Sequence, residues 1–202
     1  MPVSLWAVRW TRPLTEEEAA ALTDLLPPAR RERLSRLKSP EKRQEALCAY
    51  GLLLLALRRL KGWTVFPEMV LGDRGKPQFP DQPDVQFSVS HTAGAALAAV
   101  SDQPVGADIE RVRPVRPKVM KRVAGTEDPD AFFRCWVRRE ARSKCSGAGV
   151  GSMLRTEPPV EAGEFYQAAD VFPDCAAGVA YQSPGPAELI RLELDELLES
   201  LL

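Results

Sequence analysis

Two carboxylates, Asp108 and Glu110, are separated by a single residue within the segment Val105–Glu110. In an extended strand, alternation sends the three apolar side chains of this segment to one face and both carboxylates to the other. Their α-carbons would then be about 6.6 Å apart, near enough for both side chains to hold one hard cation through oxygen. Because many solvated strands carry such a pair, a metal site needs a third member.

The segment 130–147 supplies a candidate for that third member. Phe133, Val137, Glu140 and Lys144 fall on one stripe of the helix that this segment predicts. An exposed ion pair between Glu140 and Lys144, contributing about 0.3 to 0.5 kcal/mol, is the alternative, but the apolar neighbours make it less attractive. A third carboxylate with a lysine one turn on suits a metal-bound pyrophosphate, which defines a class of reaction.

Three segments, FSVSHT at Phe87–Thr92, GADIE at Gly106–Glu110 and WVRREARSKCSG at Trp136–Gly147, resemble the signature segments of 4′-phosphopantetheinyl transferases. Their order and spacing match the surfactin-synthetase type of that family. The resemblance extends to Gly75–Pro77 and more loosely to Pro28–Arg43, so it covers roughly residues 1–150. It implies transfer of the phosphopantetheine arm of coenzyme A to a serine of an apo acyl or peptidyl carrier protein, with release of 3′,5′-ADP.

The same resemblance implies a role for each matching residue. Asp108, Glu110 and Glu140 would hold Mg²⁺, with Mn²⁺ as an alternative, and the metal would bind the pyrophosphate of coenzyme A. Glu140 would help to remove the proton of the serine hydroxyl. The residues expected to hold the phosphates and nucleotide of coenzyme A are Arg33, Arg43, Lys76, Ser90, His91 and Lys144.

The fold that the resemblance implies is α+β, with two similar α/β halves related by a pseudo-twofold axis. Each half is a small antiparallel sheet packed on a long helix, and the active site lies between them. We place the halves at residues 1–101 and 102–202, with the polar turn Ser101–Pro104 as the boundary. A two-half chain of this kind is expected to be a monomer.

Some residues depart from the family pattern. Arg139 stands where lysine usually precedes the glutamate, and Val137 replaces a hydroxyl residue after the tryptophan. The segment Arg111–Asp130 is short and rich in proline, and in the family this region helps to receive the carrier protein. The sequence therefore leaves the choice of carrier and pathway open.

Two rival functions come from other classes. A metal-dependent nuclease or phosphohydrolase would use the same three carboxylates and lysine, with the basic segment on a nucleic-acid backbone. It would lack interleaved aromatic residues for stacking, and a pI near 6.0 is low for a duplex binder. An inactive carrier-binding module is the other rival, and retention of the three carboxylates argues against it. We therefore expect no nucleic-acid partner.

Local signals predict the elements that must position these residues. Caps, prolines and glycines bound the helices, and runs of alternating or β-branched residues mark the strands. The final stretch spaces its leucines as an amphipathic helix would, either to pack on the body or to bind a partner. The predictions are strands at 3–10, 85–90, 95–100 and 105–110, helices at 15–26, from 29, at 39–61, 128–147 and 186–202, a turn at 73–77, and short strands within 157–181.

Composition bounds the class of protein. The chain has 202 residues, 45% hydrophobic and 27% charged, which fits one globular domain or two small ones. The most apolar run, Gly51–Leu57, is far shorter than a membrane span, and no secretory signal is visible, so we expect a cytoplasmic protein without membrane contact. Four scattered cysteines and one histidine predict neither a zinc site nor a disulfide framework. The negative charge lies after residue 150, and the basic excess of residues 30–43 suits a phosphorylated or acidic partner.

Overall fold

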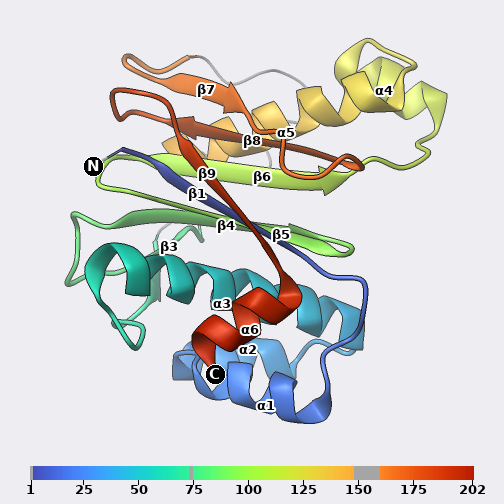
Figure 1. Ribbon diagram of the computed structural model, residues 1–202. Helices are drawn as coiled ribbons and strands as arrows, with labels where there is room; N and C mark the ends of the chain where they lie inside the picture. Colours follow the sequence, from blue (N-terminus) through green and yellow to red (C-terminus); the bar gives the residue numbers. More distant parts are fainter. Residues whose placement is uncertain (1, 73–74, 148–159) are drawn as a thin grey trace.

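The computed structural model describes residues 2–72, 75–147 and 160–202. It is a mixed α+β protein, as the sequence predicts (Figure 1). The elements, in chain order, are β1 (Ser4–Arg9), α1 (Glu16–Asp24), α2 (Pro28–Ser35), α3 (Pro40–Lys61), β2 (Val70–Leu71), β3 (Pro77–Gln78), β4 (Gln86–Thr92), β5 (Ala95–Ser101), β6 (Val105–Arg111), α4 (Pro117–Ala124), α5 (Pro129–Ser146), β7 (Phe165–Ala168), β8 (Cys175–Tyr181), β9 (Glu188–Glu193) and α6 (Leu194–Leu201).

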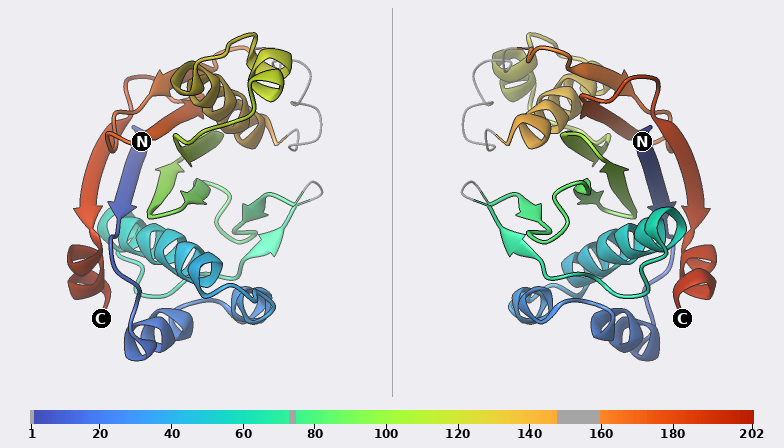
Figure 2. Two further views of the ribbon diagram at one scale, coloured as in Figure 1. Left: turned by 90° about the vertical axis from the view of Figure 1, so that its right-hand side faces the viewer. Right: turned by 90° about the vertical axis from the view of Figure 1, so that its left-hand side faces the viewer.

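The molecule is built in layers of helices and sheets (Figures 1 and 2). A four-stranded sheet in the order β4-β5-β1-β9 packs one face on α3, and a three-stranded sheet in the order β6-β8-β7 packs on α5. The two sheets face one another through apolar side chains that include Leu5, Leu97, Val105, Ile109 and Val179. The alternation predicted for β6 is confirmed on this face, and the strands β1 and β5 are buried on both sides.

The two long helices begin and end where their local signals predict. Ser39 caps α3 by accepting a hydrogen bond from the backbone N–H of Lys42, and Asp128 caps α5 by accepting from two backbone N–H groups. Each helix has proline in its first turn and ends at a glycine with positive φ, Gly62 or Gly147.

The predicted helix over 186–202 is wrong in its first half. Residues Glu188–Glu193 form β9, which runs parallel to β1 and pairs Leu5 with Leu189 and Val8 with Leu192. The edge of β1 would otherwise lack a partner, and this pairing outweighs the helical spacing of the leucines. The second half is the predicted amphipathic helix α6, whose buried leucines join the core around α3. The last two elements therefore lie with the N-terminal sheet.

The proline-rich segment after β6 contains α4, which begins at Pro117 and ends at Gly125 with positive φ. The four cysteines, all within the described residues, are free thiols, as expected. Among the helices that the structure describes, none has the length and apolar character of a membrane span.

Candidate active site

Asp108 is a buried carboxylate at the junction of β4, β6 and α5. Its Oδ1 accepts a hydrogen bond from Ser90 Oγ at 2.7 Å and another from Lys144 Nζ at 2.7 Å. Its Oδ2 is also buried and has no hydrogen-bond partner among the described residues. A buried carboxylate oxygen without a partner is costly, so this oxygen is suited to a further ligand.

A row of hydroxyl side chains on β4 holds β6 in place. Ser88 Oγ accepts from the backbone N–H of Ala107 at 3.0 Å, and Thr92 Oγ1 accepts from the N–H of Arg111 at 3.1 Å. Ser90 lies between them and donates to Asp108. Because these residues alternate along β4, all three point to the same side of the strand. They join the two sheets and fix the register of the carboxylate strand.

The close approach of β6 to α5 depends on Gly106. A Cβ atom at this position would lie 2.0 Å from the carbonyl oxygen of Ala141 and 2.2 Å from the backbone nitrogen of Cys145. Only glycine lets the strand lie this close to the helix backbone. The short distance brings Lys144 onto β6, where its Nζ also donates to the carbonyl of Ala107 at 3.1 Å.

Glu140 lies one helical turn before Lys144 on α5 and is buried. Burial is the main cause that raises the pKa of this carboxyl from 4.5 to about 7, and the nearby Asp108 adds to the effect. Lys144 opposes the rise, and Glu110 makes a smaller contribution to it. Glu140 is thus a group that exchanges its proton near neutral pH and that a cation would return to its ionised form.

Glu110 lies at the exposed end of the strand and is only half-buried. Its Oε2 accepts a hydrogen bond from Arg113 at 2.8 Å. Within the described ranges, no group of three acidic, histidine or cysteine side chains converges as a ready-made metal site. The donor set still fits a hard cation: Asp108 offers a buried free oxygen, and the charges of Asp108 and Glu110 both disfavour ionisation of Glu140.

A cavity of about 580 Å³ opens beside Asp108 and is lined from α2, α3, β4 and α5. Ser90 and Lys144, the two side chains that bind Oδ1 of Asp108, are part of its wall. The wall contains both apolar and basic side chains. The apolar residues are Leu26, Leu34, Leu37, Ala46, Tyr50 and Val89, and the basic ones are Arg30, Arg33, Lys42, His91 and Lys144.

The predicted coenzyme A residues are placed in two groups. Arg33, Ser90, His91 and Lys144 line the cavity. Lys76 instead donates to the carbonyl of Val105 at 2.9 Å, although its neighbours Gly75 and Pro77 reach the cavity wall. Arg43 donates to the carbonyl of Leu37 at 3.0 Å and is absent from the lining residues. A role of these six residues in binding coenzyme A stays a prediction.

Four residues of the site were not among those predicted to bind coenzyme A, although two of them, Arg30 and Lys42, belong to the basic segment 30–43. Lys42 and Tyr50 line the cavity from α3, and Arg30 lines it from α2. The guanidinium of Arg30 lies 5.0 Å from the ring centroid of Tyr50. Glu45 is buried on α3 and contacts both Lys42 and His91. A signal for Glu45 was present, since it is an acidic residue at the beginning of the longest apolar helix.

The chain is similar over most of its length to curated 4′-phosphopantetheinyl transferases, while no protein-family model matches it. The transferase Sfp of Bacillus subtilis is 26% identical over 168 aligned positions, and the alignment covers 75% of this chain and 74% of Sfp. HetI of Nostoc sp. is 26% identical over 209 aligned positions, and the alignment covers 88% of this chain and 86% of HetI. AcpT of Escherichia coli O157:H7 is 28% identical over 149 residues, covering 65% of this chain and 71% of AcpT.

All three relatives are 4′-phosphopantetheinyl transferases, although they come from different bacteria. The structure adds a basic cavity beside a buried carboxylate group, built from the segments that gave the sequence its resemblance. The chain is similar over about three quarters of its length to 4′-phosphopantetheinyl transferases.

Proposed function

We propose that this protein transfers the 4′-phosphopantetheine group of coenzyme A to a serine of an apo acyl or peptidyl carrier protein. The observation that carries the proposal is that Ser90 and Lys144 belong both to the wall of the basic cavity and to the hydrogen bonds of Asp108. A ligand bound in this cavity could place its phosphates among the basic side chains and a pyrophosphate next to the carboxylates. Coenzyme A carries such phosphates, including a reactive pyrophosphate, together with an aromatic base.

A divalent cation, Mg²⁺ or Mn²⁺, would be held by Asp108, Glu110 and Glu140. When bound, it would stabilise negative charge on the pyrophosphate oxygens as the phosphoryl group is transferred. The unpartnered Oδ2 of Asp108 and the raised pKa of Glu140 support this choice, because both are relieved by a nearby positive charge. Glu110 would have to exchange Arg113 for the cation.

The side chains of the site would share the remaining work. Lys144 and His91 would bind phosphate oxygens through charged or polar N–H groups, and Arg33 would do so from the cavity rim. The Glu140 carboxylate would accept the proton of the serine hydroxyl, directly or through a water. The serine oxygen would then bond to the phosphorus of the phosphopantetheine group, and the bond from that phosphorus to the bridging oxygen would break, so that this oxygen leaves with 3′,5′-ADP.

Finer features of the proposal concern subtype and assembly. The likeness to Sfp supports the surfactin-synthetase type. The pairing of one sheet with α3 and another with α5 supports two halves related by pseudo-twofold symmetry, divided near residue 101, with β9 and α6 returning to the first half. A monomeric state and a cytoplasmic location are further parts of the proposal.

The test is intact-mass spectrometry of apo acyl and peptidyl carrier proteins incubated with this protein, coenzyme A and Mg²⁺. A gain equal to one phosphopantetheine group, absent in a parallel sample with chelator, is the expected result. If coenzyme A binds but no carrier gains mass, the chain is a binding module and the proposal fails. If the protein binds DNA in a salt-sensitive manner and hydrolyses the DNA, the result would favour a nuclease instead.

A further inference from the structure

Glu45 is a carboxylate buried in the wall between α3 and the cavity. Its side chain is 4% exposed, and both of its oxygens accept hydrogen bonds from Lys42 Nζ, at 2.9 and 2.8 Å. Its Oε2 is also 3.0 Å from Nδ1 of His91. A negative charge next to an anion-binding cavity would repel a phosphate, so a carboxylate at this position is expected to have another role. Its two contacts indicate what that role is.

The hydrogen-bond pattern assigns the proton between Glu45 and His91. Both oxygens of Glu45 accept hydrogen bonds from the ammonium of Lys42, which is the pattern of a carboxylate. An ionised carboxylate can only accept, so Nδ1 of His91 must carry the hydrogen that lies between them. The other ring nitrogen, Nε2, is then left for a ligand, and His91 is one of the residues that line the cavity.

We infer that Glu45 is a positioning residue that holds His91 with its Nδ1 protonated and its Nε2 available to an anionic group of the substrate. Glu45 does not contact the ligand itself. It fixes the orientation of the imidazole ring through the hydrogen bond that it accepts from Nδ1. This inference rests on the proposed function in one respect, the identity of the anion as a phosphate of coenzyme A.

The direct test uses the fact that the chain contains one histidine. Protein labelled with ¹⁵N-histidine gives a single imidazole spin system, whose nitrogen shifts report the tautomer without any substrate. The inference predicts a protonated Nδ1 in the wild-type protein and loss of that preference in Glu45→Met, which has a similar length but no acceptor. Glu41→Met, on the same helix and exposed, is the matched control and should keep the wild-type spectrum.

Two NMR results would overturn the inference. One is a wild-type His91 with the proton on Nε2, since Glu45 would then be the donor. The other is a spectrum of Glu45→Met identical to that of the wild type. If Glu45→Met does not fold, Glu45→Gln serves the same purpose, because it retains an oxygen but loses the charge and should show a mixture of tautomers.

Binding of coenzyme A tests the consequence for the ligand through a double-mutant cycle. Glu45→Met and His91→Ala should each raise the Kd for coenzyme A, measured by calorimetry, about tenfold. In the His91→Ala background, Glu45→Met should change the Kd by less than twofold, because its effect passes through the ring. An equal tenfold loss in both backgrounds would assign Glu45 to the helix alone and reject the inference.

The two arms separate this inference from the proposed function. A wild-type protein that binds no coenzyme A would contradict the proposed function, while the tautomer of His91 would still decide the role of Glu45. In a protein that transfers phosphopantetheine, Glu45→Met should raise the KM for coenzyme A and change kcat by less than threefold. A fall in kcat with unchanged KM would contradict positioning of a binding group.

Discussion

Lys144 donates a hydrogen bond to Oδ1 of Asp108 at 2.7 Å, which makes an ion pair between α5 and β6 in the interior of the site. The side chain of Asp108 is 7% exposed and that of Lys144 is 26% exposed. Neither charge is fully solvated, so each depends on the other for compensation. This pair therefore links the stability of the metal-free protein to the chemistry of its site.

Removal of the ammonium should leave a buried carboxylate with a single partner, Ser90. We predict that Lys144→Met lowers the free energy of unfolding by about 2 to 4 kcal/mol, measured by urea denaturation. Lys121→Met is the control, because Lys121 and Glu127 form a mostly exposed pair whose loss should cost less than about 0.5 kcal/mol. Equal, small effects of the two substitutions would show that Asp108 does not need this partner.

Glu140 should make the stability of the metal-free protein depend on pH. Its pKa in the folded protein, about 7, is above the value of 4.5 for an unperturbed carboxyl, so the folded state binds the proton more tightly. The stability that results is fully present below about pH 4.5 and is lost as pH rises through about 7. In chelator, wild-type stability should therefore fall from about pH 5 to about pH 8 more than that of Glu140→Gln, by about 2 kcal/mol.

Urea denaturation of both proteins at several pH values measures this difference. Parallel curves for the wild type and Glu140→Gln would contradict the assignment of the raised pKa to Glu140. Addition of Mg²⁺ should flatten the wild-type curve, because a bound cation favours the ionised carboxylate.

Gly106 should tolerate no side chain. We predict that Gly106→Ala lowers the free energy of unfolding by more than about 3 kcal/mol or prevents folding, because backbone atoms of α5 cannot move aside as a side chain would. Gly72→Ala is the control, since its Cβ would meet its neighbours at 3.4 Å or more. Thermal melting by circular dichroism compares the two, and similar melting temperatures would refute the close approach.

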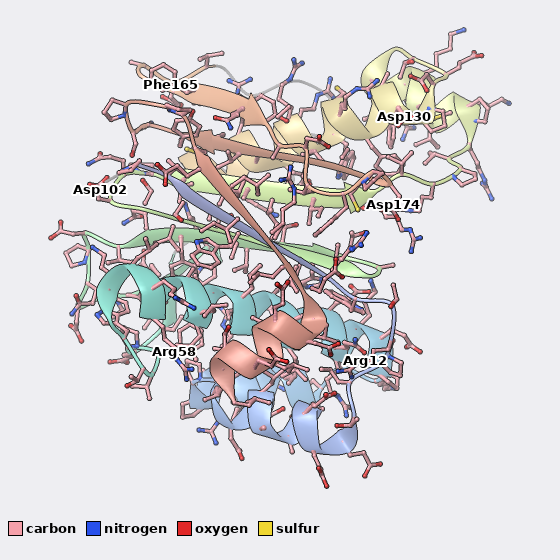
Figure 3. All side chains as sticks on the ribbon, viewed as in Figure 1. Arg12, Arg58, Asp102, Asp130, Phe165 and Asp174 are labelled. Atoms are coloured by element: carbon pink, nitrogen blue, oxygen red, sulfur yellow. The ribbon has the colours of Figure 1, made fainter. Side chains whose placement is uncertain are left out.

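The C-terminal helix should behave as part of the core. Leu197 is fully buried and packs near Gly51 of α3, so Leu197→Ala should cost about 2 to 5 kcal/mol of stability. Leu202, with 59% of its surface exposed, should tolerate alanine within about 0.5 kcal/mol. Figure 3 shows side chains of α6 beside those of the neighbouring helices. If Leu197→Ala leaves the free energy of unfolding unchanged, α6 is not part of the core, and the alternative of a partner-binding helix would be favoured.

Local signals in the sequence predicted the ends of α3 and α5 and the face of β6 that enters the core. Local signals could not predict the contacts between segments that are distant in the sequence. Spacing alone made residues 186–202 a single helix, because the free edge of β1, about 180 residues earlier in the chain, is visible only once the sheet forms.

The candidate site shows the same limit at the scale of single side chains. Lys42 and Arg43 are neighbours on α3, and the structure places Lys42 on the cavity wall and turns Arg43 toward Leu37. Adjacent helical positions point about 100° apart, so the choice between them requires the phase of the helix relative to its neighbours. Asp108 and Glu110 share a face of β6, yet the strand leaves the core between them, which gives the two carboxylates different partners.

The most direct test of the account is the rate at which an apo carrier protein gains phosphopantetheine in the presence of coenzyme A and Mg²⁺, followed by intact-mass spectrometry. We compare the wild type with Asp108→Asn, at the buried carboxylate, and Asp174→Asn, at an exposed ion pair with Arg111. The account predicts transfer by the wild type, a rate within twofold of it for Asp174→Asn, and a rate at least about 100-fold lower for folded Asp108→Asn. Transfer by Asp108→Asn at the wild-type rate would contradict it.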